Sequence, residues 1–233
     1  MKKWLAVLLI LLAIAPIIAV ATANADDEKI VYITFDDGPT GNTPAILDTL
    51  AKYNAKATFF VLDGKIKEYP QYLTRIISEG HSIGLHGISH DVHVIYKSPS
   101  EPLYEMNRAN ETLYQTCGFT TRLIRTPYGS YPYMTNEQYN ILTAASYNLW
   151  DWTVDPRDSV GDAPSASGML KRIKEDLKGN SCPIVLLHDR KSTSNNLDYI
   201  LSYFASEGYT FGVIDEKMTP VNFMKLYGPS KDK

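Results

Sequence analysis

Short apolar runs, rich in β-branched and aromatic residues, alternate along the chain with longer segments of helical periodicity. The runs predict strands over residues 30–35, 56–61, 82–86, 121–125, 147–152, 184–188 and 209–214. The longer segments predict helices over 43–53, 69–79, 102–116, 136–145, 167–177 and 197–207. We expect Thr43 to cap the first helix, because Pro44 then takes the first helical position. Strands that alternate with helices are typical of βα units.

Near-continuous apolar strands, such as Ile184-Val185-Leu186-Leu187, indicate burial on both faces and hence a parallel sheet covered by helices. Such units can form an open doubly wound sheet or a barrel. Polar residues follow nearly every strand, and in a barrel the carboxyl ends of all strands surround one opening. The pattern therefore favours a barrel. No linker or internal repeat divides the chain, so we expect one domain.

The first 25 residues read as a targeting segment. Lys2 and Lys3 precede an apolar run that ends near Ala23-Asn24-Ala25, the small-residue pattern of a cleavage site. The alternative is an uncleaved membrane anchor. In both cases residues 26–233 form the folded domain, at the cell surface or secreted, and contact the membrane only through this segment.

The charge changes little but excludes one class of partner. Loss of the leader removes two lysines and no acid, so the formal net charge of −3 becomes −5. A nucleic-acid-binding protein would need a basic stripe, so we expect no nucleic-acid binding.

Cys117 and Cys182 are the only cysteines in the sequence, and they can form a disulfide or remain two separate thiols.

Two candidate chemical sites follow the first and third predicted strands. Asp36 and Asp37 are adjacent at a strand end, where one carboxylate can hold a cation while the other accepts a proton. A solvated acidic turn is the alternative. His86 and His90 are four residues apart, and with a carboxylate they form a ligand set that leaves coordination positions open for water.

Further polar residues follow in a fixed order: Arg125 in Arg-Thr-Pro-Tyr-Gly, then Asp155 and Asp158, then His188 after Leu186-Leu187. With the aspartate pair and the histidine pair, this order resembles carbohydrate esterase family 4, the polysaccharide deacetylases with a NodB-homology domain. The resemblance spans roughly residues 30–214. It implies a distorted (β/α)7 barrel.

The resemblance also implies roles for individual residues. Asp37, His86 and His90 match the metal ligands, usually for Zn²⁺, with another divalent transition metal such as Co²⁺ as an alternative. Asp36 matches the catalytic base, and Arg125 the residue that orients it. His188 matches the general acid, and Asp158 the carboxylate that tunes it. The backbone N–H of Tyr128 matches an oxyanion donor, and Leu186 a wall of the acetyl pocket.

The implied activity is hydrolysis of N-acetyl groups on a cell-wall glycan, foremost the N-acetylglucosamine of peptidoglycan, by a monomer. The alternatives are a chitin-oligomer deacetylase, an O-deacetylase of xylan or another acetylated polymer, and a glycan-binding pseudoenzyme. Two residues depart from the family pattern. Gly87 stands where Ser or Thr is usual, which predicts a modest loosening of the ligand loop, and Ser159 stands where Trp often lines the acetyl pocket.

The remaining histidines and the aromatic residues receive simpler interpretations. His81 opens a strand at its N-terminal end, which favours a structural role, and His93 is expected on the surface. Trp150 or Trp152 could replace the missing tryptophan at position 159. Tyr128, Tyr131 and Tyr133 suit stacking on sugar faces, although ordinary packing is the favoured explanation for any single one.

Overall fold

The sheet is built around its longest strand, β1 (Ile30–Gly38), in a computed structural model that describes residues 28–161 and 165–229. The other strands are β2 (Thr58–Val61), β3 (Ser82–Leu85), β4 (Leu123–Ile124), β5 (Asn148–Leu149), β6 (Ile184–His188) and β7 (Thr210–Gly212). Their order is β5-β4-β3-β2-β1-β6, and β7 pairs with the first residues of β1. All pairings are parallel.

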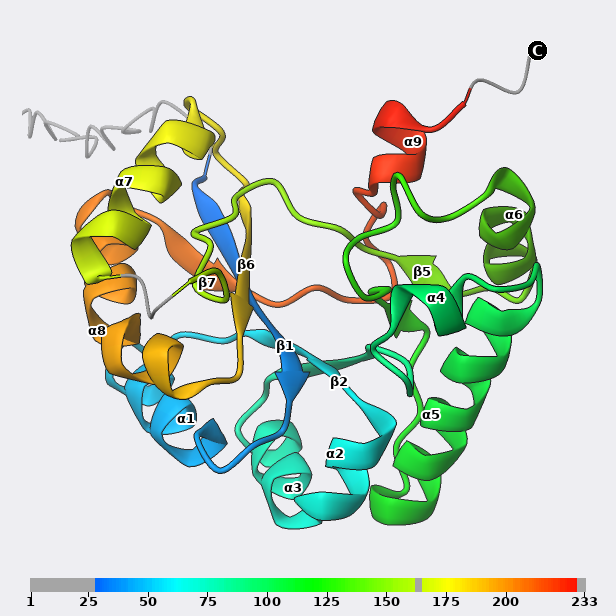
Figure 1. The fold of residues 1–233 in the computed structure, drawn as a ribbon. Coiled ribbons are helices and arrows are strands. Elements are labelled where there is room, and N and C mark those ends of the chain that lie inside the picture. Colours follow the sequence, from blue (N-terminus) through cyan, green and yellow to red (C-terminus); the bar gives the residue numbers. More distant parts are fainter. Residues whose placement is uncertain (1–27, 162–164, 230–233) are drawn as a thin grey trace, which may run out of the picture.

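The two ends of this sheet approach each other through a single bridge. Val154, in the segment after β5, pairs with Val185 of β6. The N–H of Thr153 and the N–H of Leu186 complete this contact by donating to the carbonyls of Ile184 and Val154. The strands therefore curve into a distorted barrel, as the sequence predicts, with a narrow closure in place of a full ladder (Figure 1).

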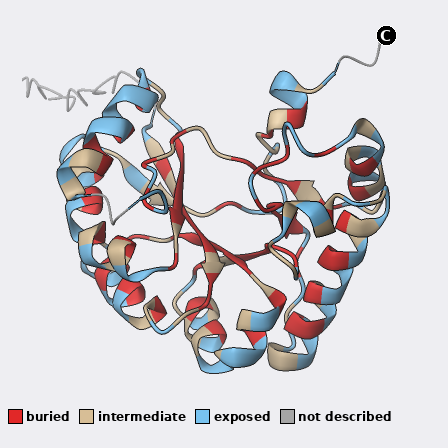
Figure 2. Ribbon diagram, in the orientation of Figure 1, coloured by how far each residue is buried: buried red, intermediate tan, exposed pale blue. Residues whose placement is uncertain are grey.

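Helices surround the outside of this curved sheet (Figure 1). The longer ones are α1 (Thr43–Lys52), α3 (Pro70–Ser78), α5 (Glu101–Cys117), α6 (Asn136–Ala144), α7 (Ala166–Leu177) and α8 (Lys191–Ser206). The short ones are α2 (Asp63–Glu68), α4 (Val92–Ile95) and α9 (Phe223–Tyr227). Figure 2 shows that the helices bury the side toward the sheet and expose the other, which is the amphipathic arrangement expected of an outer layer.

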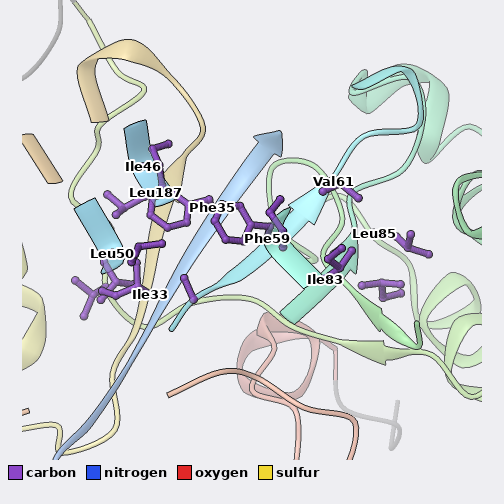
Figure 3. Close-up of a cluster of buried hydrophobic side chains, with 14 of the residues drawn as sticks. Ile33, Phe35, Ile46, Leu50, Phe59, Val61, Ile83, Leu85 and Leu187 are labelled. Carbon is purple, nitrogen blue, oxygen red and sulfur yellow. The ribbon is translucent and has the colours of Figure 1, made fainter. Parts of the chain in front are cut away.

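Strand alternation divides the buried side chains between the two faces of the sheet. Ile33 and Phe35 of β1 pack outward against α1 and β2, in the cluster of Figure 3. Phe35 stacks on Phe59, with ring centroids 5.0 Å apart. Thr34 and Asp36 belong to the opposite face, inside the barrel. The same alternation therefore places Asp36 in the interior, where the site described below lies.

The predicted strands are all present, with shorter spans in most cases. The three short helices were not predicted, and α8 begins at Lys191, earlier than the predicted start at 197. The cap prediction was wrong. Asn42 occupies the cap position of α1, and Thr43 is the first helical residue, whose hydroxyl donates to Asp189 at 2.5 Å.

Two sequence expectations concern the ends of the chain and its cysteines. The predicted leader, residues 1–25, lies outside the described residues. Within the part that the structure describes, no helix is both long and apolar enough to cross a membrane.

Cys117, at the end of α5, and Cys182, before β6, are free thiols. Of the two possibilities left open, the structure shows the unpaired one.

Candidate active site

The carboxyl ends of β1, β3 and β6 and the loops that follow them meet at one pocket of about 420 Å³. Among the residues singled out from the sequence, those that line it from or just after these strands include Asp36, Asp37, His86, His90, Leu186 and His188, and Asp155 lines it from the segment after β5. Tyr128 contributes from the loop after β4. Side chains that are far apart in the sequence thus converge, as the barrel prediction requires.

Asp37, His86 and His90 form a triangle suited to a metal ion. Their candidate ligand atoms all lie within 4.8 Å of one another. Asp37 Oδ1 is 3.1 Å from His90 Nε2 and 3.6 Å from His86 Nε2. It is also a buried oxygen for which the described residues provide no hydrogen-bond donor. Two imidazoles and a carboxylate are the donor set of a His₂-carboxylate site, so these residues fit a divalent ion.

The ring orientation of the two histidines agrees with that use. His86 Nδ1 lies 2.7 Å from the carbonyl oxygen of Arg125, so this nitrogen carries the proton and Nε2 keeps its lone pair. Tyr128 contacts His90 from outside: its hydroxyl donates to the His90 carbonyl at 3.1 Å, and the hydroxyl oxygen lies 3.4 Å from ring Nδ1. Outer contacts of this kind fix the tautomer and the ring orientation of metal-binding histidines.

The pKa values of the three residues in the triangle are all shifted by their surroundings. Burial alone would raise the pKa of Asp37, but the imidazole of His90, whose Nε2 lies 3.1 Å from Oδ1, and the nearby His86 lower it well below the ordinary range. Burial lowers the pKa of His86, so its ring stays neutral. The close carboxylate of Asp37 raises the pKa of His90.

The backbone at the site is unusual. Asp37, His90 and Tyr128 adopt positive φ angles of 68°, 47° and 66°, a region that residues with a Cβ rarely enter. Each costs roughly 1–3 kcal/mol and persists because surrounding contacts hold it. Such residues cluster at functional sites, and three of them line this one pocket.

Asp36 is held by a buried arginine. Arg125 has no exposed surface, and its Nη1 donates to Asp36 Oδ1 at 2.9 Å and to Thr34 Oγ1 at 2.7 Å. Its guanidinium carbon lies 4.2 Å from the centroid of the Phe60 ring. The other oxygen of Asp36 is 3.8 Å from His86 Nε2, on the side of the metal triangle. Arg125 therefore fixes one carboxylate oxygen and leaves the other beside the ligands.

His188 and Asp158 form a second pair across the pocket. His188 Nδ1 lies 2.7 Å from Asp158 Oδ1, and the backbone N–H of His188 donates to Oδ2 at 2.7 Å. Asp158 is only 1% exposed. Burial alone would lower the pKa of His188, but the bond to Asp158 and its charge outweigh this and raise it. The ring nitrogen at the pocket is therefore readily protonated.

The apolar side of the pocket combines expected and alternative residues. Leu186 lines it, since alternation along β6 turns Leu186 and His188 to the same interior face. Ser159 lines the pocket without a large ring, and Trp152 lies at the same pocket. Trp150 is 1% exposed and belongs to the interior core. Of the two tryptophans considered as replacements, Trp152 alone reaches the pocket in the described structure.

Glu105 was missed by the sequence analysis. This α5 residue is 2% exposed, and its Oε2 accepts from the N–H groups of Ile88 and Ser89 at 2.8 and 3.1 Å. Its Oε1 accepts from the Ser89 hydroxyl at 2.6 Å. A Cβ on Gly87 would lie 2.8 Å from Oε2, and Gly87 has φ of 88°. The glycine thus admits a carboxylate that braces the ligand loop between His86 and His90.

Asp189 was also missed, although it follows His188 directly. It is 3% exposed and accepts from the hydroxyls of Thr40 and Thr43 at 2.8 and 2.5 Å. Burial raises its pKa. A Cβ on Gly38 would lie 2.7 Å from Asp189 Oδ2, so the glycine lets the turn after Asp37 approach this carboxylate. Both missed acids hold a loop that carries a metal-ligand candidate.

The fold and this set of side chains define a hydrolase-type site in a parallel barrel, and comparison with known proteins specifies the family. A family model described as polysaccharide deacetylase matches residues 23–147. The chain belongs to the polysaccharide deacetylase family, whose solved members include the carbohydrate esterases of family 4.

Two relatives and one solved structure show how close the similarity is. A putative polysaccharide deacetylase, YheN of Bacillus subtilis, is 38% identical over 84% of this chain and 70% of its own length. A peptidoglycan-N-acetylglucosamine deacetylase of Bacillus cereus is 32% identical, over 86% and 75%. The crystal structure of the polysaccharide deacetylase Bc1974 from Bacillus cereus superposes with a TM-score of 0.77 at 31% identity, over 84% of this chain and 97% of that one.

Proposed function

We propose that this protein is a metal-dependent N-deacetylase of a cell-wall glycan, and that the N-acetylglucosamine of peptidoglycan is its main substrate. The observation that carries the proposal is the single pocket in which a His₂-carboxylate triangle adjoins both an Arg-held aspartate and an Asp-held histidine. Each of these groups has a use in hydrolysis of an acetamide.

Asp37, His86 and His90 would hold the ion, with Zn²⁺ as the first candidate and Co²⁺ as an alternative. A divalent ion bound with an open position lowers the pKa of a coordinated water and polarises a carbonyl oxygen. The residues around the triangle prepare it for this. Arg125 and Tyr128 orient the two imidazoles, and the low pKa of Asp37 keeps its carboxylate charged.

Asp36 is the proposed general base. Arg125 immobilises one of its oxygens, while the second faces the metal triangle at 3.8 Å from His86 Nε2. That oxygen can take the proton from the attacking water. The backbone N–H of Tyr128 is the proposed donor to the oxyanion, since the positive φ of this residue sets the turn at the pocket edge.

His188 is the proposed general acid. An amine is a poor leaving group until it is protonated, and the pair with Asp158 keeps His188 protonated to a higher pH than usual. Asp36 and His188 are register partners on β1 and β6. The two proposed proton-transfer groups therefore lie side by side on neighbouring strands at the pocket.

Leu186 and Trp152 are the proposed walls for the acetyl methyl group. Both line the pocket, and the methyl group is the only apolar part of the substrate that must enter it. We further propose that the protein acts outside the cytoplasm, which rests on the leader-like segment of the sequence and on the cell-wall substrate in the name of the Bacillus cereus relative. A monomer remains the expectation drawn from the family resemblance.

The test is acetate release from a panel of peptidoglycan, chitin oligomers and acetyl-xylan, with metal-stripped and metal-restored protein. We expect release from peptidoglycan to be fastest, to stop on chelation and to return with Zn²⁺ or Co²⁺. Faster release from chitin oligomers or acetyl-xylan would replace the substrate assignment. Full activity in the complete absence of metal would contradict the mechanism.

A pseudoenzyme is the competing interpretation outside catalysis. The arrangement argues against it, because a binding protein needs neither an arginine-held carboxylate nor a carboxylate-held histidine in its pocket. Binding of all three glycans without acetate release from any of them would establish that alternative.

A further inference from the structure

A row of aromatic rings leads away from the pocket toward the C-terminal helix. Trp152 lines the pocket, and its ring centroid lies 5.0 Å from that of Phe223. Phe223 is 5.8 Å from Tyr227, and Tyr227 is 6.5 Å from Tyr131. These four rings, here named the aromatic strip, run without interruption from the pocket to exposed surface.

The outer end of the aromatic strip is open. Tyr227 is 62% exposed and Tyr131 is 40% exposed. The inner end is closely packed, because a Cβ on Gly129 would lie 3.1 Å from Trp152 and 3.2 Å from Phe223. The glycine thus lets these two rings lie against the backbone of the loop that carries Tyr128.

A buried carboxylate holds the two halves of the aromatic strip together. Asp151 has no exposed surface, and it accepts from the N–H and hydroxyl of Ser130 and, at 2.6 Å, from the N–H of Phe223. The Ser130 hydroxyl oxygen in turn accepts from the N–H of Met224 at 3.2 Å. Ser130 precedes Tyr131, and Phe223 begins α9, so one acid ties the active-site loop to the C-terminal helix.

The start of α9 has a second anchor. Asn222 is 1% exposed, its Oδ1 accepts from the N–H of Lys225 at 2.9 Å, and its Nδ2 donates to the carbonyl of Leu149 at 3.3 Å. Burying a carboxylate such as that of Asp151 is costly unless each of its oxygens is hydrogen-bonded, as both are here. The result is a five-residue helix whose rings keep a fixed position at the rim of the barrel, beside the loop before α6 (Figure 1).

We propose that the aromatic strip is a distal binding surface for a glycan chain whose acetylated sugar occupies the pocket. This rests on the proposed function, and it adds the part of the substrate that the strip would bind. A sugar ring has an apolar face of C–H groups and a polar edge, and a tyrosine ring offers a matching flat face with a hydroxyl. The strip is continuous with the pocket through Trp152 and offers ring faces along its length, which suits the sugar backbone of a glycan that extends from the pocket.

The test is the dependence of activity on chain length. We compare the wild type with Tyr131→Ala/Tyr227→Ala, using chitobiose, chitohexaose and 4-nitrophenyl acetate as substrates. In the double variant we expect the KM for chitohexaose to rise about three- to tenfold, the effect of losing stacking partners. The kcat for chitohexaose and the activities on the two short substrates should stay as in the wild type.

The matched control is Tyr104→Ala/Tyr114→Ala, which removes two exposed rings from α5, on the outer surface (Figure 1). It should leave all three substrates unaffected. A double variant of Tyr131 and Tyr227 with an unchanged KM for chitohexaose, or with equal losses on long and short substrates, would overturn the proposal.

Failure of the proposed function would look different. In that case the wild type releases acetate from no glycan, and binding of chitohexaose is followed instead by the change in tryptophan fluorescence. Weaker binding in the Tyr131/Tyr227 double variant, with chitobiose unaffected, would support the aromatic strip without the deacetylase. Identical binding of wild type and variant would reject it.

Discussion

Asp36 and Asp37 are adjacent in the sequence, yet they differ in backbone conformation, in exposure and in side-chain partners. Asp36 has extended backbone within β1, and its side chain is 4% exposed and paired with Arg125. Asp37 has a left-handed backbone, and its side chain is 31% exposed and turned toward His86 and His90. The change of backbone conformation between the two residues separates the proposed base from the proposed ligand.

We predict that substitutions of these two aspartates have different consequences. Asp37→Asn removes a charged ligand and should weaken metal binding together with activity. Asp36→Asn should retain the metal and lower turnover about 10²–10⁴-fold, the usual contribution of a general base. Metal content and kcat of both purified variants check this. Loss of metal in Asp36→Asn with retention in Asp37→Asn would reverse the two roles.

The pair of His188 and Asp158 predicts a pH effect. A general acid works while it is protonated, so activity falls as pH rises through the pKa of His188, which Asp158 raises. Asp158→Asn removes the charge and should lower that pKa. The alkaline limb of the kcat/KM profile should therefore move to lower pH, by about one unit or more. An alkaline limb that keeps its position in the variant would exclude His188 as the acid.

Helix α5 shows why one element can carry a function that its sequence pattern conceals. Its buried face includes Pro102, Met106, Ala109 and Leu113, and Glu105 falls on that same face. An acid at a core-facing position is the signal that could have identified it, because such a residue needs a partner. The partners are backbone N–H groups of the ligand loop, and no sequence pattern indicates that contact.

We predict that Glu105→Ala weakens metal binding about tenfold or more, the usual effect of removing an outer-shell contact. The substitution leaves the N–H groups of Ile88 and Ser89 without their acceptor, so the loop between His86 and His90 loses its fixed shape. Competition with a chelator measures the affinity. Glu105→Gln keeps one acceptor oxygen, so its metal affinity should lie between those of the wild type and Glu105→Ala.

The matched control for this prediction is Glu111→Ala on the same helix. Glu111 pairs with Arg108 on the exposed side of α5, so the change should leave metal affinity as in the wild type. A natively folded Glu105→Ala protein with wild-type affinity would show that Glu105 serves the helix alone.

The sequence predicted the strands and longer helices because their hydrophobic periods extend over several residues. Helices α2 and α4 are too short for such a period, and α2 also lacks a side-chain cap. Helix α9 has its cap in Asn222, but five residues give no repeat to detect. The metal triangle was predictable from His86 and His90 in sequence, whereas Asp151, Asp189 and Glu105 act through contacts between distant segments.

The molecule as a whole places its histidines at opposite ends of the barrel. His86, His90 and His188 line the pocket, while His81 precedes β3 at the other end, and His93 is exposed as expected. His81 is buried against Phe59, and its Nδ1 accepts from the N–H of Ala57 at 3.1 Å. These contacts agree with the structural role expected for it. Burial lowers the pKa of His81 from 6.5 to about 4.

We predict that this histidine makes stability depend on pH. Between pH 6.5 and about 4 the unfolded chain binds a proton at His81 that the folded protein does not. This contribution to the free energy of unfolding is complete above pH 6.5 and is lost as pH falls toward 4, by up to about 3 kcal/mol. Urea unfolding of wild type and His81→Asn at several pH values measures it.

The difference in the free energy of unfolding between wild type and His81→Asn should narrow as pH falls from 6.5 to about 4. His93→Asn is the control, and its stability should follow the wild-type pH dependence. A constant gap between wild type and His81→Asn from pH 7 to pH 4 would contradict the prediction.

The register between β1 and β6 has a consequence for how this protein can diverge. Asp36 and His188 are direct partners in a parallel pair, so hydrogen bonds of the sheet, about 4.8 Å between strands, set their separation. The residues that would meet the rest of a glycan, such as Tyr131, Trp152 and Tyr227, come from segments outside the regular strands. Exchange of those segments can therefore alter which polymer is accepted, while the distance between the proposed base and the proposed acid stays the same.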